Sequence, residues 1–362
     1  MGLYLCIIGV MIIFGLGHIK GVKEERVLLV VILFLYLLVS LRSITIGNDT
    51  RNYSVIFYNM QNFLGFQKYQ GRFEFGYLLL NYIVARITPC FTAFLLIENA
   101  FVYYAYYFFI KNNSSNYSLS VLLFLCLGYW GRTANTLRLE IAVACFLIAY
   151  CLFEKGKKFW GITGGIIGFF FHRISLSYWG ICFVPKKINY KFYFISGLVT
   201  AGVYVFFEKF INAFVLIFPY FNNYLNGTKY VVNDVKLAIV LKWILVFFVW
   251  VFSYCIYQKK KCNLSVESQK LMESQINMVF VSLLILFLST RFNLLDRCEE
   301  LYGTFIIVLI PNIIKLFDKK RSYLLVYFLF TGLAVLYFIV VNVYRPYWNV
   351  IYPYHTFFYD IF

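Results

Sequence analysis

The chain has 362 residues, of which 62% are hydrophobic and only 14% are charged. A water-soluble protein of this length needs more polar surface than that, so the composition excludes an ordinary soluble enzyme. A net charge of +17 would suit nucleic-acid binding, but in a membrane protein the distribution of charge between loops matters more than its sum. We therefore expect an integral membrane protein surrounded by a lipid bilayer, with no nucleic-acid partner.

Apolar runs recur along the whole chain, many close to the roughly 20 residues that a helix needs to cross a bilayer. They predict an all-α, polytopic membrane protein with about 11–12 hydrophobic helices and a single integral membrane domain over 1–362. The first run lacks the features of a cleaved signal peptide, so we expect it to be retained. The runs are 3–19, 27–41, 73–88, 91–110, 119–131, 135–153, 159–184, 192–207, 237–257, 276–290, 300–317 and 323–343.

Lysines gather in compact loops that the positive-inside rule assigns to the cytoplasm. Two longer polar stretches, 42–72 and 208–236, fall on the opposite side and are predicted to be extracytoplasmic loops. The basic loops contain Lys20, Lys23 and Arg26; Lys155, Lys157 and Lys158; Lys186, Lys187 and Lys191; Lys259 to Lys261 with Lys270; and Lys319, Lys320 and Arg321.

Two apolar segments conflict with this topology. The run 159–184 joins two cytoplasmic loops, which indicates a broken hairpin with His172 and Arg173 near its centre. Five runs between two other cytoplasmic loops give the wrong parity, so one of them does not cross fully, and 73–88 and 119–131 are the shortest. Irregular backbone at membrane depth is tolerated where it lines a wet cavity, so broken segments indicate the functional site.

The first polar stretch brings cations, a carboxylate and hydroxyls together at the predicted outer surface. Asn48 or Asp49 can cap a new helix on which Asp49 and Tyr53 share a face. An ordinary interfacial helix would explain part of this pattern, but not the two arginines beside it. The candidate residues in this stretch are Arg42, Asp49, Thr50, Arg51 and Tyr53.

Arg132, Asn135 and Arg138 follow one another at i, i+3 and i+6, which would place them along one side of a helix in a strongly apolar stretch. Ionised groups so close to hydrocarbon usually face a bundle interior or a cavity. Arg138 is therefore a candidate functional residue, with an internal ion pair as the alternative. Glu140 lies on another side of the helix and is not the expected partner.

His172, beside Arg173, can accept a proton from a hydroxyl while its neighbour holds an anion, although a histidine in an apolar run is also commonly structural. Arg291 and Arg297 lie in a charged stretch that is either a solvated loop or a phosphate-binding one. The sequence has no Walker loop, no HExxH and no compact metal-ligand set. We expect no cofactor and no bound metal.

Several short motifs, in order, resemble the EpsG family of bacterial membrane proteins, which are relatives of the Wzy-type polysaccharide polymerases. The family pattern reads Arg, Gly-x-Asp-Thr, Tyr, then Glu-x-Gly-Tyr/Phe, then Arg-Gln-x-x-Ala, then Phe-His. The resemblance covers about residues 3–355, with one departure, because Leu139 replaces the glutamine. The matching residues are Arg42, Gly47, Asp49, Thr50, Tyr53, Glu74, Gly76, Tyr77, Arg138, Ala142, Phe171 and His172.

The resemblance implies a metal-independent, GT-C-like membrane glycosyltransferase in the bacterial cytoplasmic membrane. Its substrate would be a polyprenyl-diphosphate-linked oligosaccharide, polymerised at the outer face into O-antigen, capsule or exopolysaccharide, with a flippase and a chain-length regulator as candidate partners. Asp49 or His172 would accept the acceptor proton, and arginines such as Arg138 would stabilise the leaving diphosphate. The remaining candidates, including Glu74, would bind substrate.

Three other functions compete with this one. A flippase or transporter of lipid-linked glycan also needs an arginine-lined cavity, but it more often shows internal repeats and needs no base. A membrane O-acyltransferase would use His172 to activate a sugar hydroxyl. A scaffold for other assembly enzymes would tolerate substitution of Arg138 or His172 without a change in glycan length.

Overall fold

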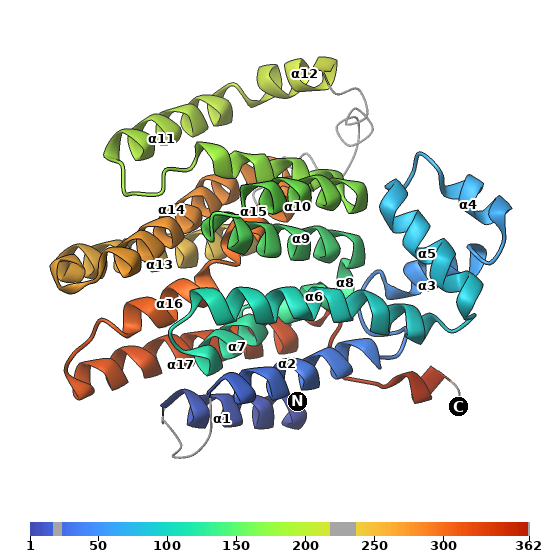
Figure 1. Cartoon of the computed structure of the whole chain (residues 1–362), viewed down its shortest axis with the longest axis horizontal. Coiled ribbons are helices and arrows are strands. Elements are labelled where there is room, and N and C mark those ends of the chain that lie inside the picture. Colours follow the sequence, from blue (N-terminus) through green and yellow to red (C-terminus); the bar gives the residue numbers. More distant parts are fainter. Residues whose placement is uncertain (17–23, 218–236, 361–362) are drawn as a thin grey trace. The chain divides into compact units, whose positions relative to one another are not determined.

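The computed structural model describes residues 1–16, 24–217 and 237–360 (Figure 1). Within these ranges the chain is almost entirely helical and has no strand, only two isolated bridges, so the predicted all-α class is confirmed. It divides into two compact units, Met1–Tyr178 with Phe317–Phe362, and Trp179–Leu316. We call them unit 1 and unit 2 and describe each by itself.

Unit 1 contains the amino-terminal helices and the last long helix. Its helices are α1 (Gly2–Leu16), α2 (Glu24–Ser40), α3 (Thr50–Asn59), α4 (Phe63–Tyr69), α5 (Phe75–Ile87), α6 (Phe91–Asn113), α7 (Tyr117–Cys126), α8 (Tyr129–Asn135), α9 (Leu137–Glu154), α10 (Lys158–Phe171), α17 (Lys320–Tyr344), and the 3-10 turns η5 (Pro346–Trp348) and η6 (Phe357–Asp360). The 3-10 segment η1 (Arg173–Phe183) begins in unit 1 and ends in unit 2.

Unit 2 is built around α14, which packs against α11, α13, α15 and α16. Its helices are α11 (Tyr190–Val205), α12 (Phe207–Ile217), α13 (Leu237–Lys260), η3 (Lys261–Asn263), α14 (Val266–Ser289), η4 (Asn293–Leu295), α15 (Asp296–Gly303) and α16 (Ile306–Ile314). The predicted loop 208–236 is described only as far as 217, where it forms most of α12, and the rest lies outside the described residues.

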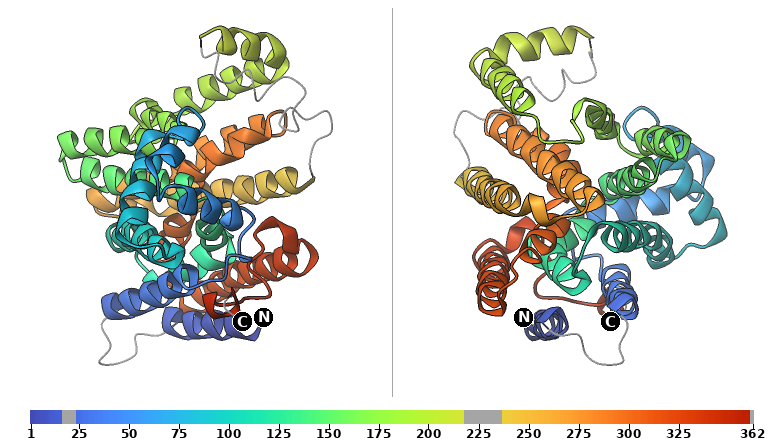
Figure 2. Two further views of the ribbon diagram at one scale, coloured as in Figure 1. Left: turned by 90° about the vertical axis from the view of Figure 1, so that its right-hand side faces the viewer. Right: turned by 60° about the vertical axis from the view of Figure 1, so that its left-hand side comes forward.

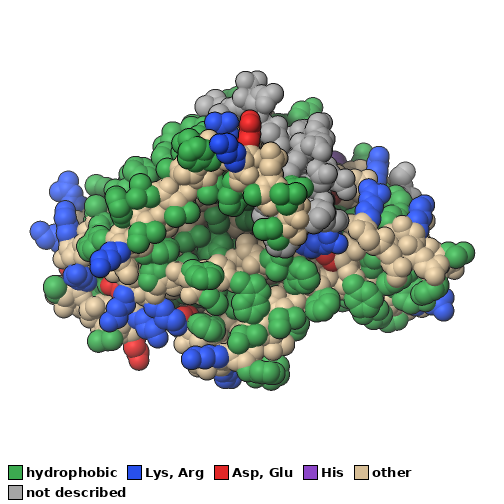
Figure 3. Space-filling view, turned by 90° about the horizontal axis from the view of Figure 1, so that it is seen from above, with side chains coloured by type: hydrophobic (Ala, Val, Ile, Leu, Met, Phe, Trp, Pro, Cys, Tyr) green, Lys and Arg blue, Asp and Glu red, His purple; other side chains and the backbone are tan. Residues whose placement is uncertain are grey.

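The helices are apolar enough for a multi-pass membrane protein. By length and composition α6, α13, α14 and α17 can each span a bilayer, or five spans can form if α11 and α12 count as one bent span. Shorter apolar helices include α1, α5, α7 and α10. Hydrophobic side chains cover much of the surface seen in Figure 3. A lipid-embedded backbone must satisfy its own hydrogen bonds, which explains why these runs fold as helices.

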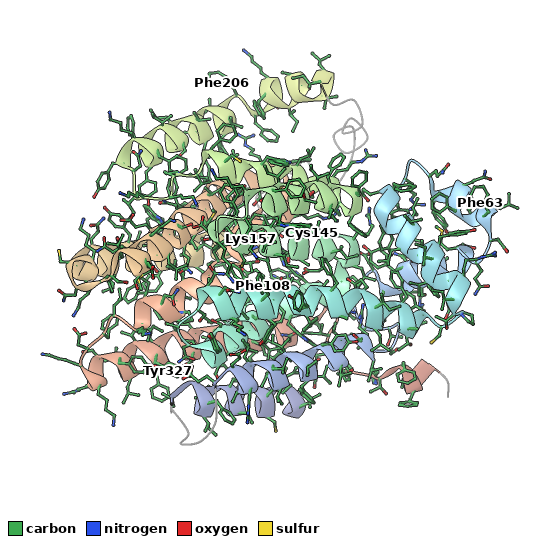
Figure 4. The ribbon with its side chains drawn as sticks, viewed as in Figure 1. Phe63, Phe108, Cys145, Lys157, Phe206 and Tyr327 are labelled. Atoms are coloured by element: carbon green, nitrogen blue, oxygen red, sulfur yellow. The ribbon has the colours of Figure 1, made fainter. Side chains whose placement is uncertain are left out.

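The long helices of unit 1 run side by side, with α6 antiparallel to α2 and parallel to α9, as the contacts of Tyr106 with Glu140 and of Asn113 with Cys151 show (Figures 1 and 2). Helix α6 packs against α2 and α9, and α9 packs against α10. The start of α2 meets the end of α6, where Glu25 accepts a hydrogen bond from Lys111. Tyr327 of α17, labelled in Figure 4, donates to the carbonyl of Ile12 on α1 at 3.2 Å.

This arrangement identifies the segment between 27 and 153 that does not cross. Helices α3, α4 and α5 gather at one end of α2 and α6, with Phe63 of α4 labelled in Figure 4. The 13 residues of α5 and the 10 of α7 are both too short for the roughly 30 Å hydrocarbon core, so the direction of the chain separates the two candidates. Helix α6 then returns toward the start of α2, so α5 is the segment that upsets the parity.

The predicted break in the run 159–184 is present. Helix α10 ends at Phe171, His172 has an extended backbone with φ −155° and ψ 126°, and a 3-10 segment follows. The basic residues Lys155 and Lys158 lie at the opposite end of α9 and α10 from His172 (Figure 1). Unit 1 therefore has a lysine end and, opposite to it, an end where the irregular segments collect.

Candidate active site

A salt bridge between α9 and the start of α5 lies at the centre of the irregular end of unit 1. The Nη1 of Arg138 lies 2.5 Å from Oε2 of Glu74, and the two side chains are only 17% and 9% exposed. The other oxygen, Oε1, accepts a hydrogen bond from the backbone N–H of Arg173 at 3.2 Å. The Glu74 carboxylate thus joins α9 to the chain that follows α10.

Aromatic rings surround the guanidinium of Arg138. Its Cζ lies 4.6 Å from the ring centre of Phe73 and 5.9 Å from that of Tyr77. Tyr53 of α3 packs edge-on against Tyr77 at 5.8 Å and lies within electrostatic range of Arg138. The Nε of Arg138 has no hydrogen-bond partner in the described part of the chain. The cation is therefore oriented by rings while part of its donor capacity stays unused.

The loop between α2 and α3 packs directly against the end of α8. Gly47 has φ +89°, and a Cβ there would overlap the carbonyl oxygen of Ala134 and the hydroxyl of Thr50. The buried hydroxyl of Thr50 donates to the carbonyl of Ala134 at 3.1 Å and to that of Ile46 at 2.6 Å. The chain therefore needs glycine at position 47 to bring this loop close to the residues before Arg138.

Asn135 connects this loop to α8. Its Oδ1 accepts the backbone N–H of Asn48 at 2.5 Å, and its Nδ2 donates to the carbonyls of Gly131 at 2.7 Å and Asn349 at 2.8 Å. All three partners are backbone groups, so Asn135 fixes the geometry of three chain segments. Its own side chain is buried. This places Asn135 in a supporting position within the site.

The prediction that Arg132, Asn135 and Arg138 lie along one helix is wrong. Thr136, with φ −119° and ψ 57°, separates α8 from α9, so the first two residues lie on one helix and Arg138 begins the next. The side chain of Asn135 bonds to backbone groups at this break, as asparagine does where it competes with helical hydrogen bonding. The interruption turns Arg138 toward Glu74.

The other two motifs meet at the start of α5. A Cβ at Gly76 would lie 2.8 Å from the carbonyl oxygen of Phe170, so the missing side chain lets α5 approach the end of α10. His172 follows directly and is buried. Together with the Glu74 contact to Arg173, this brings all four motif segments, 47–50, 74–77, 135–138 and 171–173, into one cluster, which we call the motif cluster.

The ring of His172 is already engaged on one side. Its Nδ1 accepts the backbone N–H of Ile174 at 3.2 Å. A neutral imidazole with Nδ1 as acceptor carries its proton on Nε2. In this arrangement the Nδ1 of His172 is occupied by a backbone hydrogen bond.

Asp49 has a different environment. It precedes α3 at the predicted capping position, but its side chain makes no cap hydrogen bond, because its backbone is near-helical with ψ −3°. Its carbonyl accepts the N–H of Tyr53, but its side chain makes no hydrogen bond or ion pair within the described residues and is partly exposed. It lies one turn before Tyr53, the residue near Arg138. Asp49 thus supplies an unengaged carboxylate at the edge of the motif cluster.

Arg42 is buried beneath the loop instead of facing outward. It is 1% exposed; its Nη1 donates to the carbonyl of Val39 and its Nη2 to that of Ala134 at 3.1 Å. The nearest acidic residue in electrostatic range is Glu98 of α6, itself buried and with neither carboxylate oxygen hydrogen-bonded in the described chain. Arg42 therefore supports the loop that carries Asp49.

The other predicted cations are distributed over both units. Arg51 is exposed on α3, and Arg132 and Arg173 are partly exposed on α8 and η1. Arg291 and Arg297 belong to unit 2, where Arg291 lies 4.9 Å from the ring centre of Tyr204. The acids of that stretch pair with Lys242 of α13, which bonds Asp296 at 2.8 Å and also Glu299. Glu299 is fully buried, so this part of the stretch is not simply a solvated loop.

Sequence reasoning missed two supporting features. Glu98 is an ionisable residue within an apolar run, a pattern that by itself indicates function in a membrane helix. The segment after α17 was assigned no role, yet its backbone binds Gly47, Asn48 and Asn135. No local pattern in the sequence reveals those long-range contacts.

The motif cluster offers cations, a free carboxylate and a histidine donor. Within the described residues no group of three or more His, Cys, Asp or Glu side chains is placed to hold a metal ion. Such an arrangement can stabilise an anionic leaving group with Arg138 and deprotonate a hydroxyl with Asp49.

Comparisons with known proteins agree with the motif order. No curated protein and no solved structure matches the chain. The model of the EpsG family matches residues 25–356, which include every segment of the motif cluster. The chain therefore belongs to the EpsG family.

Proposed function

We propose that this protein joins polyprenyl-diphosphate-linked oligosaccharide repeat units by glycosyl transfer. Membership of the EpsG family supports a polysaccharide-polymerase role in general. The observation that carries the specific proposal is the meeting of four distant motif segments at the Glu74–Arg138 salt bridge. This cluster combines the groups needed for a diphosphate leaving group and a hydroxyl nucleophile.

In the proposed reaction the growing chain on polyprenyl diphosphate is the donor and a sugar hydroxyl of the next lipid-linked repeat is the acceptor. The bond between the anomeric carbon and the diphosphate oxygen breaks, and the acceptor oxygen bonds to that carbon. The electron pair leaves with the diphosphate, and the hydroxyl proton passes to a base. The bonds broken and formed account for every atom and electron in this reaction, so it needs no ATP and no redox partner.

Asp49 is the proposed base because its carboxylate is unengaged and partly exposed. Arg138 is proposed to stabilise the departing diphosphate with the donors that the Glu74 salt bridge leaves unused. His172 would donate from Nε2 to a phosphate oxygen, since its Nδ1 is occupied. Thr50, Asn135 and Arg42 would position the loop, and Arg51, Arg132 and Arg173 would contact substrate.

The proposed site lies on the outer side of the cytoplasmic membrane. In unit 1 the motif cluster and the lysine end are at opposite ends of the long helices (Figure 1). The positive-inside rule assigns the lysine end to the cytoplasm, so the cluster faces the other way. An outer site also suits a substrate that a flippase delivers and a product whose length a regulator controls. A GT-C-like fold and contacts from Arg291 and Arg297 stay predictions.

The competing functions fit the geometry less well. An O-acyltransferase needs His172 to take a proton, but the only nitrogen of its neutral ring that can do so accepts the Ile174 N–H. A flippase needs no base, and so it gives no reason for an unengaged carboxylate beside Arg138. A scaffold needs neither group.

The test is glycan chain length in a deletion strain complemented with wild type, Asp49→Asn, Arg138→Lys or, as a control at the lysine end, Arg26→Lys. We expect long chains with wild type and the control, and single repeats with the two site variants at equal protein levels in the membrane. Long chains in the uncomplemented deletion strain would refute polymerisation. Long chains with Asp49→Asn would refute the assignment of the base.

A further inference from the structure

The segment that follows α17 packs over the motif cluster through its backbone. The N–H of Gly47 donates to the carbonyl of Val350 at 3.0 Å, and that of Ser43 to the carbonyl of His355 at 2.9 Å. Further along, Phe357 donates to the carbonyl of Leu41 at 2.9 Å. We call residues 345–357 the strap. It holds the loop that carries Asp49 and also contacts α8, because Asn135 donates to the carbonyl of Asn349 at 2.8 Å.

The first part of the strap contacts the loop at Asn48, the residue before Asp49. The Nδ2 of Asn48 donates to the carbonyl of Tyr347 at 3.1 Å and to that of Trp348 at 2.8 Å. Both contacts use main-chain oxygens of the strap, so the two aromatic side chains play no part in them. The short turn Pro346–Trp348 thus places two rings within a few residues of the proposed base.

Neither ring is buried in the core of unit 1. Tyr347 is 85% exposed and Trp348 is 43% exposed, whereas most large aromatics of unit 1 near the cluster, such as Tyr53 and Tyr77, are buried. An adjacent pair of exposed aromatic rings beside a polar site is a common form of binding surface. Flat aromatic faces with polar edges suit the apolar C–H face of a sugar ring.

We infer that Tyr347 and Trp348 form a sugar-stacking subsite that holds a ring of the lipid-linked oligosaccharide next to Asp49. The inference rests on the proposed function and specifies where the glycan, as distinct from its diphosphate, is bound. The occupant is a carbohydrate because the two adjacent rings are aromatic and their backbone is bonded to the loop that carries the base. The competing role for such rings, anchoring at the lipid–water interface, is one outcome of the test.

The experiment uses the full chain in lipid nanodiscs and lipid-linked repeat units extracted from the deletion strain. Initial rates of chain elongation are measured against repeat-unit concentration for wild type, Tyr347→Ala, Trp348→Ala, Tyr347→Phe and Trp348→Phe. We expect each alanine variant to raise KM about 3- to 10-fold with little change in kcat, the strength typical of one aromatic contact. The phenylalanine variants keep a planar ring and should retain near-wild-type KM.

Controls separate binding from folding and from anchoring. Tyr344→Ala removes another exposed ring, 75% exposed, from the end of α17 outside the strap, and it should change neither KM nor kcat. If an alanine variant does not accumulate, Trp348→Leu keeps apolar bulk without a planar ring and should show the same raised KM. The fluorescence of Trp348 is obtained by subtracting the signal of the Trp348→Phe variant from that of wild type. We expect this signal to change when repeat units are added, and we expect no quenching when brominated lipids replace the ordinary lipids of the nanodisc.

The outcomes distinguish the inference from the function on which it rests. If wild type elongates the repeat units but the alanine variants keep a normal KM, the polymerase stands and the stacking subsite is wrong. Quenching of Trp348 by brominated lipid without a response to repeat units would overturn the subsite in favour of an interfacial anchor. If wild type elongates nothing, the proposed function fails and the subsite fails with it.

Discussion

Glu74 and Arg138, 64 positions apart in the sequence, form a salt bridge that joins the start of α5 to the start of α9. Because both side chains are largely buried, removing one partner leaves an uncompensated charge in a poorly solvated place. The pair therefore has two separable roles, one in stability and one in the proposed reaction.

The first prediction separates these roles. Arg138→Met should lower the free energy of unfolding by about 3–5 kcal/mol, because the Glu74 carboxylate loses its cation. The double variant Glu74→Gln with Arg138→Met removes both charges and should recover most of that stability without recovering chain elongation. Thermal unfolding in detergent measures the first quantity and the glycan ladder the second. Elongation by the double variant would show that Arg138 is only structural.

A second prediction concerns the close approach of the loop to α8. Gly47→Ala must adopt φ +89° and place a methyl group against the carbonyl of Ala134, which we expect to destabilise the protein by at least about 2 kcal/mol and to abolish elongation. Gly332→Ala in α17 meets nothing within 4 Å and should be neutral or slightly stabilising. Equal melting temperatures for the two variants would contradict the packing of the loop described above.

The helices were largely predictable because long apolar runs can satisfy their backbone only as helices in a bilayer. The break at His172 was also predicted, because the run 159–184 joins two loops that the positive-inside rule assigns to the cytoplasm. The broken helix at Thr136 was not predicted, since the apolar pattern continues through it. Its cause lies in the bonds of Asn135 to Asn48 and Asn349, which no local pattern reveals.

The candidate site also has residues that the sequence could identify and residues whose position it could not predict. Arg138 could be singled out because a guanidinium in an apolar run needs an explanation, and that explanation includes Glu74, which was predicted only through a family resemblance. Arg42 looked like a surface cation at a helix exit but is buried against backbone carbonyls. Sequence identifies unusual residues, whereas the direction in which each one points depends on contacts between segments that lie far apart along the chain.

A third prediction tests which side of the membrane the motif cluster faces. In a background without native cysteines, Arg51→Cys should react with a membrane-impermeant maleimide in intact cells, while Lys157→Cys should react only after the membrane is opened. Both side chains are exposed and lie at opposite ends of the long helices of unit 1. The reverse pattern would place the cluster in the cytoplasm and exclude an outer-face polymerase.

The last prediction concerns the two buried charges beneath the loop. Within the described residues the Arg42 guanidinium has only backbone hydrogen-bond partners, and Glu98 is the acidic group in its electrostatic range. Neither carboxylate oxygen of Glu98 has a hydrogen bond in that part of the chain. If Glu98 is ionised as the counter-charge, Glu98→Gln should lower the free energy of unfolding by about 1–3 kcal/mol and reduce elongation by loosening the loop that carries Asp49.

The matched control is Glu25→Gln, which removes an acid from an exposed ion pair with Lys111 and should cost less than about 1 kcal/mol. Thermal unfolding of both variants in the same detergent gives the comparison. A neutral or stabilising Glu98→Gln would mean that Glu98 is protonated in the folded protein. Arg42 would then be held by the carbonyls of Val39 and Ala134 alone, and the loop would owe its position to the strap and to Asn135 instead of to a buried charge pair.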